Sequence, residues 1–549
     1  MTGSTDADET APLLAPSRHP IHHDANGHNS HDHGSNPLQA QTAESHSLPP
    51  ATRPTAPARR VVIIAVLFSL AVVLAISSSV LTTAMMQALE DIICRRLGAD
   101  KLSFDCKDDA VMGELTILTG WDAVFALIPG LLLSVPYGAM ADRYGRVPVL
   151  GLVMLGLTLG AVWVSIVCYM DGTLDLRLIW LANLCQIIGG GGPVFSSMVF
   201  TMLADISTDA QRSTAFLYIG TVLMASTLVA QPITYVAMQQ GTWFALGLGM
   251  SLLTTSTAVA FCIPETLDKT RAKKVDPTPL TDAQTDGSSS RQNRKRGPLV
   301  YLEKAQAAIL HTARAMRWLF WEQKLVGFLL LSLACELLGK SVWVAIQQQY
   351  ISKRYHLTFA EASLVSTVGL ATTIVVLSVV LPYLSHILLT RYGYSSRAKD
   401  LRLSQVSALL TAAGCVLASI SDTLPMFCAS LAISCLGIGY TYMIRGLMTS
   451  LIGAKDLGLL YASIALVDSV AVLVAMPLFS YLFKFGMQLG GGWIGLPYHV
   501  AGVILVGAAV LVSGVREAYV DVDEGEDAAV GGGASRESEE EEEAVAARS

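Results

Sequence analysis

The chain has 549 residues, of which 52% are hydrophobic and only 15% are charged, and its mean hydropathy is +0.50. Soluble domains carry about 25% charged residues, so this composition excludes a soluble protein of two or three domains and indicates a polytopic membrane protein. The net charge of −7 comes mainly from an acidic C-terminal tail and carries no information about a substrate. We expect no nucleic-acid partner.

Residues 1–58 form a polar tail that we expect to be disordered and cytosolic, because it cannot bury enough apolar area to order itself. Glu9, Leu13 and Leu14 fit the acidic dileucine pattern that sorting adaptors bind. We therefore expect the protein either in a vacuolar or endosomal membrane or in the plasma membrane. Six histidines can bind zinc or copper weakly, but no fixed ligand spacing accompanies them, so we expect neither a metal site nor a cofactor. They are His19, His22, His23, His28, His31 and His33.

Six apolar runs follow within residues 59–264, and each is long enough to cross a bilayer, which takes roughly 20 residues. The first run lies behind the polar tail, so we expect it to remain as a membrane helix and not to be cleaved as a signal peptide. The loop after it contains Cys94 and Cys106, which either form a short disulfide on the exocytoplasmic side or remain free thiols. We place the runs at residues 61–88, 115–137, 147–169, 178–202, 215–238 and 243–263.

A short charged turn joins the second and third runs and contains Gly138, Asp142, Arg143, Gly145 and Arg146. Its acid and two arginines must lie at the membrane surface, because charged side chains are costly inside the hydrocarbon. The glycines let the two helices and the turn pack closely.

The fourth run contains four consecutive glycines, 189–192, followed by Pro193. No Lys-Ser/Thr pair follows them, so the segment does not fit a phosphate-binding loop. We interpret it as a site where helices approach closely and bend.

Residues 265–320 form a polar linker that we expect in the cytosol, and its second part predicts an amphipathic helix in the headgroup region. The alternative is an early start of the seventh span. Six further apolar runs lie within residues 321–516, before an acidic tail, residues 517–549, that we expect to be disordered. The runs are residues 324–347, 362–388, 404–420, 425–449, 459–483 and 496–515.

Most loop lysines and arginines lie on one side of these spans, and this side is the cytosol by the positive-inside rule. An even number of spans then leaves both termini in the cytosol. Lys101, Lys353 and several other basic residues lie on the opposite side, so the cytosolic side carries most of the loop lysines and arginines but not all of them. The cytosolic set comprises Arg59, Arg60, Arg143, Arg146, Arg212, Arg294, Lys295, Arg296, Arg391, Arg397, Lys399, Arg402 and Arg516.

The turn with Gly138, Asp142, Gly145 and Arg146 resembles the Gly-x-x-x-Asp-Arg/Lys-x-Gly-Arg motif of the major facilitator superfamily. The resemblance extends to Asp205 after the fourth span and covers nearly the whole chain except the tails. It implies an all-α membrane protein of twelve transmembrane helices in two six-helix halves, acting as a monomer.

Other segments are similar to fungal metabolite and drug efflux carriers related to the proton-coupled folate and heme carrier branch of that superfamily. They include Gly120-Trp121, Pro136-Tyr137-Gly138 and Arg445-Gly446-Leu447.

The resemblance implies a gate in which Asp142 accepts hydrogen bonds from a helix N-terminus, that of the eleventh span, and Arg146 pairs with Asp205. These contacts would hold the inner ends of the halves together when the carrier faces outward. Arg143 fits a positive-inside anchor equally well. The corresponding turn of the second half lacks the acid. Arg391 or Arg402 is therefore the candidate for the residue that locks the gate on that side.

Five charged residues lie inside the predicted spans, where each costs roughly 2.5–3.5 kcal/mol and needs a partner or a cavity. Glu336 and Lys340 are four residues apart on one helix face, so they form either a functional or a purely structural pair. We expect Asp122, Glu336 or Asp468 to exchange the coupling proton, with Asp468 as first choice. For Arg445 we expect its side chain to extend to the inner surface more than to contact substrate.

Five polar or aromatic residues in otherwise aliphatic spans are candidates for cavity walls, because they can hydrogen-bond or stack with a cargo. Core packing is the alternative for each of them. They are Gln186, Trp343, Gln347, Tyr440 and Tyr442.

Together these features imply a proton-coupled secondary transporter of small organic molecules that exports or compartmentalises a metabolite or toxic compound, and not an enzyme. Drug antiporters of the superfamily carry a Gly-x-x-x-Gly-Pro signature in the fifth span, whereas this chain has Thr227 and Gln231 at the glycine positions. Proton-symport import of a nutrient is therefore an alternative. A non-transporting sensor on a carrier scaffold is another.

Overall fold

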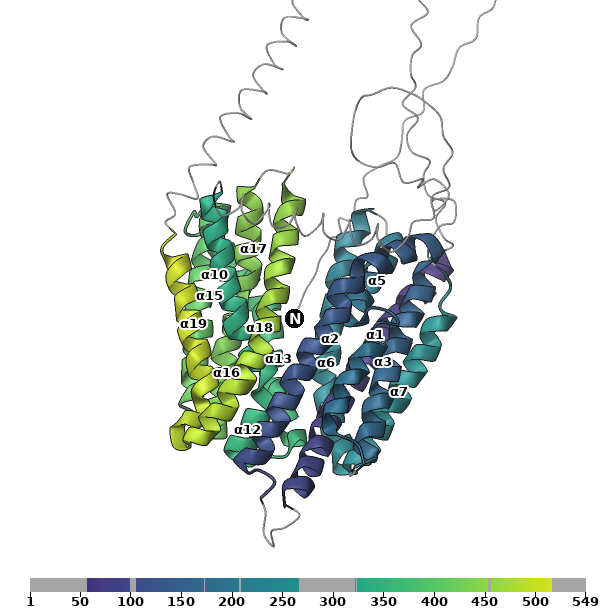
Figure 1. Ribbon diagram of the computed structural model, residues 1–549. Coiled ribbons are helices and arrows are strands. Elements are labelled where there is room, and N and C mark those ends of the chain that lie inside the picture. The colour runs from purple at the N-terminus through teal and green to yellow at the C-terminus, as the bar shows by residue number, and fades with distance from the viewer. Residues whose placement is uncertain are drawn as a thin grey trace, which may run out of the picture. The chain divides into compact units, whose positions relative to one another are not determined.

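A computed structural model (Figure 1) describes residues 57–98, 105–171, 173–206, 209–265, 321, 323–452 and 456–515, and this part of the chain contains helices and no β-strand. Eleven of its helices are long and apolar enough to cross a membrane. The sorting motif at Glu9, Leu13 and Leu14, the histidine cluster, the amphipathic linker helix and the acidic tail lie outside the described residues. The described part is therefore an all-α membrane protein.

The first half is built around α1, which packs along two later helices of the same half. Long apolar sequences form these helices because a helix satisfies all of its backbone hydrogen bonds internally. The uninterrupted helices of this half are α1 (Pro57–Gly98), α2 (Asp109–Tyr144), α3 (Arg146–Tyr169), α6 (Asp209–Gln239) and α7 (Thr242–Cys262).

The second half repeats this arrangement with more interruptions. Its core pairs are α15 with α19, α15 with α16 and α10 with α19. The elements are α10 (Lys324–Lys340), α11 (Val342–Ala345), α12 (Gln347–Tyr355), α13 (Phe359–Val375), the π-helical turn η2 (Val376–Val380), α14 (Leu381–Thr390), α15 (Ser396–Ser419), α16 (Leu424–Leu436), α17 (Gly439–Leu451), α18 (Leu457–Leu489), η3 (Gly491–Gly495) and α19 (Leu496–Ser513).

The fourth predicted span, residues 178–202, is not one continuous helix. It consists of η1 (Leu176–Leu181), α4 (Ala182–Cys185) and, after a break, α5 (Gly191–Ile206). Gly189 at the break has φ 153°, and a Cβ there would lie 2.5 Å from the Cα of Val153 on α3. The backbones approach so closely that only glycine fits, and the helix is interrupted where they meet.

Several helices extend beyond the predicted apolar runs. The first ends at Gly98, ten residues later than expected, and α15 begins at Ser396 instead of residue 404. The added turn of α1 carries Arg95 and Arg96, which form ion pairs with Asp171, and Ser395 caps α15 by accepting a hydrogen bond from the Ala398 N–H. Polar contacts thus continue these helices past the apolar runs that predicted them.

The two halves meet toward one end of the helices, which we call the disulfide end because the α1–α2 loop there contains Cys94 and Cys106. The opposite end, at the Gly145 turn between α2 and α3, is the turn end. One buried apolar cluster spans both halves at the disulfide end, whereas the buried clusters near the turn end belong to one half each. The shared cluster includes Leu89, Met112 and Leu115 of the first half and Tyr350, Phe359 and Phe483 of the second.

The contact between α2 and α18 illustrates this arrangement. Gly113 and Gly120 in the first turns of α2 lie directly against Lys484 and Ser480 near the end of α18. Farther along α2, Leu132 and Val135 are 71% and 79% exposed. Figure 1 shows α12 beside the end of α2 where the halves meet.

Candidate functional site

Arg146 is the centre of the polar contacts at the turn end. Its Nη1 lies 2.5 Å from Asp142 Oδ1, and its Nε lies 3.3 Å from Asp205 Oδ2 at the end of α5. The Glu265 carboxylate accepts hydrogen bonds from the backbone N–H groups of Arg146 and Val147, which start α3. A carboxylate at a helix N-terminus is favourable because of the helix dipole.

The structure therefore brings Arg146 and Asp205 together but does not show the expected contact of Asp142 with the start of the eleventh span, α18. The Asp142 side chain is 67% exposed and pairs with Arg146 instead. The Arg143 guanidinium lies over the neighbouring Tyr144 ring, and a Cβ at Gly138 would meet no atom within 4 Å.

Glu265 belongs to the Pro264-Glu265-Thr266 segment that extends the resemblance to the superfamily, but the sequence predicts no role for it. The sequence feature that indicated a contact was the position of Glu265 at the end of the sixth span, on the same membrane surface as the charged turn. A close approach also explains Gly145, which has φ 118° and whose Cβ would collide with the Glu265 carboxylate.

A pocket with a volume of about 240 Å³ lies between α10, α11 and α17 in the second half. Its charged lining residues are Lys340 and Arg445, and Tyr442, a predicted cavity residue, contributes to its wall. The complete lining is Leu337, Lys340, Ser341, Val344, Ile438, Thr441, Tyr442 and Arg445.

The predicted Glu336–Lys340 pair and two further charged candidates, Arg445 and Asp468, form one cluster beside this pocket. Glu336 is fully buried, lies 3.8 Å from the Lys340 ammonium and accepts a hydrogen bond from the Thr441 hydroxyl. Arg445 Nη2 pairs with Asp468 Oδ2 at 2.6 Å, and both of these charges act on Glu336. Two acids and two bases make the cluster neutral, which reduces the cost of placing charges within a membrane.

The extension of Arg445 to the inner surface stays a prediction; in the structure its side chain pairs with Asp468 on α18. Among the described residues, Glu336 Oε1 and Asp468 Oδ1 are buried oxygens without a hydrogen-bond partner. Each carboxyl therefore keeps one unsatisfied oxygen inside the protein.

The first half contains a second polar group, made by α2 and the interrupted fourth span. Asn183 donates from Nδ2 to Asp122 Oδ1 at 2.8 Å, and Gln186 donates from Nε2 to Asn183 Oδ1 at 2.9 Å. Asp122 and Gln186 thus belong to one chain of hydrogen bonds. Sequence reasoning missed Asn183, although an amide within an apolar run was the available signal.

Three of the five predicted cavity residues have other surroundings. Tyr440 is fully buried, and its hydroxyl lies 2.6 Å from Ser332 Oγ. It therefore packs in the core, which was the alternative to a place in the cavity wall. Trp343 lies in an aromatic cluster with Tyr498, with ring centroids 4.9 Å apart. Gln347 donates to Ser366 Oγ at 3.3 Å.

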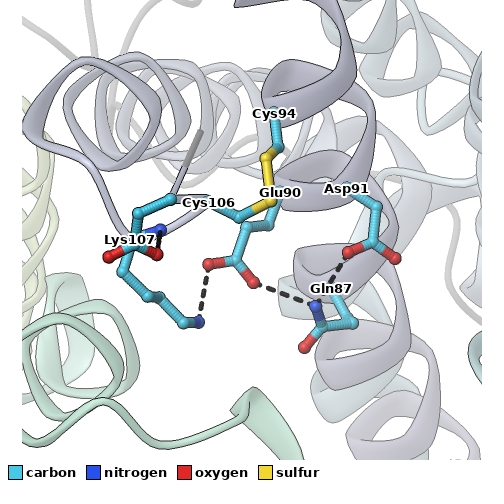
Figure 2. The surroundings of a disulfide bond; sticks show 7 residues. Gln87, Glu90, Asp91, Cys94, Cys106 and Lys107 are labelled. Atoms are coloured by element: carbon cyan, nitrogen blue, oxygen red, sulfur yellow. Dashed lines mark hydrogen bonds and ion pairs between the residues drawn. A yellow bond between two sulfur atoms is a disulfide. The ribbon is translucent and has the colours of Figure 1, made fainter. Parts of the chain in front are cut away.

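At the disulfide end, Cys94 and Cys106 are joined by a disulfide, and Lys107 follows it directly (Figure 2). Lys107 Nζ lies 2.6 Å from Glu90 Oε1 on α1 and 2.5 Å from Ser352 Oγ on α12. Lys353 Nζ reaches both the Lys107 carbonyl, at 2.5 Å, and Asp109 Oδ1, at 2.6 Å. We call these five residues, Glu90, Lys107, Asp109, Ser352 and Lys353, the lysine bridge, because they tie the two halves together.

Asp171, in the turn after α3, binds the two arginines at the end of α1. Arg95 and Arg96 approach its two carboxylate oxygens at 2.9 and 3.1 Å. Partial burial by itself would raise the pKa of Asp171, but the two guanidinium groups outweigh this and lower the pKa below its ordinary value.

The described residues form two groups of membrane-spanning helices that share a core at one end, and one group contains a charged pocket. This arrangement is typical of membrane transporters built from two halves. No protein-family model matches the chain. The MFS efflux pump atnC of Emericella nidulans is 29% identical over 416 residues, which are 75% of this chain and 77% of that protein.

The MFS-type transporter avaK of Aspergillus versicolor is 26% identical over 446 residues, 80% of this chain and 89% of that protein. The crystal structure of a D-xylose-proton symporter superposes with a TM-score of 0.54 at 13% identity, covers 82% of this chain and 97% of that one, and shows the fold alone. The chain is therefore similar in sequence to fungal efflux carriers of the major facilitator superfamily, and it has the fold of that superfamily's transporters.

Proposed function

We propose that the protein exports a small organic metabolite or toxic compound, or moves it into a compartment, by alternating access of two six-helix halves, residues 59–264 and 321–516. One observation supports this most directly: the halves share a core and the lysine bridge at the disulfide end, whereas their buried cores are separate near the turn end. A carrier that works by alternating access is closed at one end and open at the other. In the opposite state the turn end would be closed and the disulfide end open.

In this proposal the turn end faces the cytosol and the disulfide end faces the exterior or a lumen. The support is the excess of basic residues at the turn end and the disulfide at the other, since disulfides persist in oxidising compartments. In the opposite state the turn end would close, and Asp142 would then reach the N-terminus of α18. The carrier would act as a monomer in the plasma membrane or a vacuolar or endosomal membrane, with both termini in the cytosol.

Protons are the proposed coupling ion, and Glu336 is now our first candidate in place of Asp468. A proton would neutralise the buried Glu336 carboxyl, whose ion pair with Lys340 is long at 3.8 Å. Asp468 is held by a short 2.6 Å pair with Arg445 and would give up that pair on protonation. Asp122, bonded to Asn183, remains the candidate of the first half.

Deletion of the gene, followed by comparison of metabolites inside and outside the cells by untargeted mass spectrometry, tests the proposal. We expect one class of compound to accumulate inside, with recovery on complementation by the wild type or by Lys324→Met, an exposed substitution on α10 outside the pocket. Complementation by Glu336→Gln should not restore export. Unchanged metabolite levels would contradict transport.

Proton-symport import is the second candidate, favoured by Thr227 and Gln231 at the positions where drug antiporters carry glycine. Gln231 is only 8% exposed, so this position is occupied by a buried polar side chain. Loss of uptake of a nutrient in the deletion strain, in place of accumulation, would establish import. Altered gene expression without altered flux would favour the sensor.

A further inference from the structure

We propose that the pocket between α10, α11 and α17 binds the anionic end of its cargo, so that the substrate class is a small organic anion, such as a carboxylate with an apolar body. This inference rests on the proposed transport function and specifies its cargo. It is carried by the charges that line the pocket, by their unused hydrogen-bond donors and by the size of the pocket.

The charges that line the pocket have one sign. Lys340 and Arg445 contribute to the wall, whereas no aspartate or glutamate does. Neither of their partners lines the pocket: Glu336 is fully buried on α10, and Asp468, paired with Arg445 at 2.6 Å, belongs to α18. A molecule in the pocket therefore meets two cations before it meets either acid, and an anionic group is attracted most strongly.

Both cations have donors to spare. Among the described residues, the Lys340 ammonium makes a single ion pair, at 3.8 Å, which is too long for a hydrogen bond. Arg445 uses Nη2 for Asp468, while its Nε is buried without an acceptor. A cargo carboxylate would supply acceptors at Lys340 Nζ and at the exposed part of the guanidinium, forming charge-assisted hydrogen bonds. A cationic cargo would leave these donors unpaired.

The remaining wall fits the end of a molecule with an apolar body. Leu337, Val344 and Ile438 supply apolar contacts, and Val344 and Tyr442 are 80% and 49% exposed. The volume of about 240 Å³ is smaller than the roughly 300–1,000 Å³ of pockets that enclose drug-sized ligands. The pocket would thus hold the acidic end while the rest of the cargo extends past Val344 and Tyr442.

Charged thiol reagents test this inference without knowledge of the cargo. The full-length Tyr442→Cys variant in lipid nanodiscs is treated with the anionic sulfonatoethyl or the cationic trimethylammonioethyl methanethiosulfonate. Modification at position 442 is followed by peptide mass spectrometry, which separates it from the native free cysteines. We expect the anionic reagent to react at least tenfold faster than the cationic one, after correction for their rates with a free thiol.

Adding Lys340→Met to this variant should lower the ratio of the two rates about tenfold, whereas adding Lys324→Met should leave it unchanged. Loss of Lys340 alone leaves Glu336 buried without its cation, so the variant Lys340→Met with Glu336→Gln removes the whole pair and covers the case of misfolding. Equal rates in the parent variant, or a ratio unchanged in both pocket variants, would overturn the inference.

The inference and the proposed function can fail separately. A clear preference for the anionic reagent, in a protein whose deletion changes no metabolite, would retain the anion site and reject the carrier. Accumulation of neutral or cationic compounds, with no reagent preference, would retain the carrier and reject the anion site.

Discussion

The lysine bridge allows a quantitative prediction about the equilibrium between the two proposed states. Lys107 is 16% exposed and Glu90 2% exposed in their side chains, so Lys107→Met leaves a carboxylate buried without its cation. Breaking a fully buried pair costs about 3–5 kcal/mol, and the partial exposure of Lys107 reduces our expectation to about 2 kcal/mol. The cost falls only on the state closed at the disulfide end, because water solvates both groups once that end opens.

A difference of about 2 kcal/mol changes the ratio of two states roughly 30-fold. We therefore expect Lys107→Met to raise the ratio of molecules open at the disulfide end to molecules closed there by this factor. Electron–electron resonance between spin labels on unnatural amino acids at Ala110 and Thr423, both exposed at this end, reports the separation of the halves. The distance distribution should move to longer values.

Two further variants make this measurement decisive. Arg177→Met removes another exposed basic residue at the same end and should leave the distribution unchanged. Lys107→Met with Glu90→Gln removes the unpaired charge and should restore part of the closed population. An unchanged distribution in Lys107→Met would refute the reasoning, because the bridge would then contribute nothing to closure.

Three other predictions concern stability and the turn end. Gly189→Ala should destabilise the protein by about 1–3 kcal/mol and lower the Tm of the purified carrier, because φ is 153° and the new methyl group would meet Val153. Asp171 has a lowered pKa, so its contribution to stability is complete above the unfolded-state pKa, about 3.9, and is lost as the pH falls through the folded value; Asp171→Asn should remove this part of the acid dependence of Tm. Arg146→Met should release Asp205 and reduce transport with the protein still inserted, whereas wild-type flux in this variant would argue against a gate.

The order of the apolar spans was predictable because it depends on local sequence, whereas the breaks within some of them were not. Long apolar runs mark the spans, and a spacing of four residues places Glu336 and Lys340 on one helix face. The glycines of the fourth span indicated a bend, but not that the helix would stop there. Its interruption depends on how closely α3 approaches, and no local pattern reports that distance.

The pairing of distant charges was not predictable for the same physical reason. Arg445 and Asp468 lie on different helices, and whether their side chains meet depends on the rotation of α17 against α18. Tyr440 and Tyr442 look alike in sequence, yet they lie on different faces of one helix, so that one is buried and the other lines the pocket. Helix rotation, set by packing over the whole half, decided which candidates entered the site.

The disulfide has a practical consequence for preparing this carrier. Cys106 immediately precedes Lys107, so the covalent link that fixes Cys106 to α1 also limits where the Lys107 backbone can go. Protein produced in a host that does not oxidise the α1–α2 loop, or purified with strong thiol reductants, would lack this covalent link and would hold Lys107 only by its noncovalent contacts and by its place before α2. Samples from different expression hosts should therefore be compared only after their thiol content has been determined.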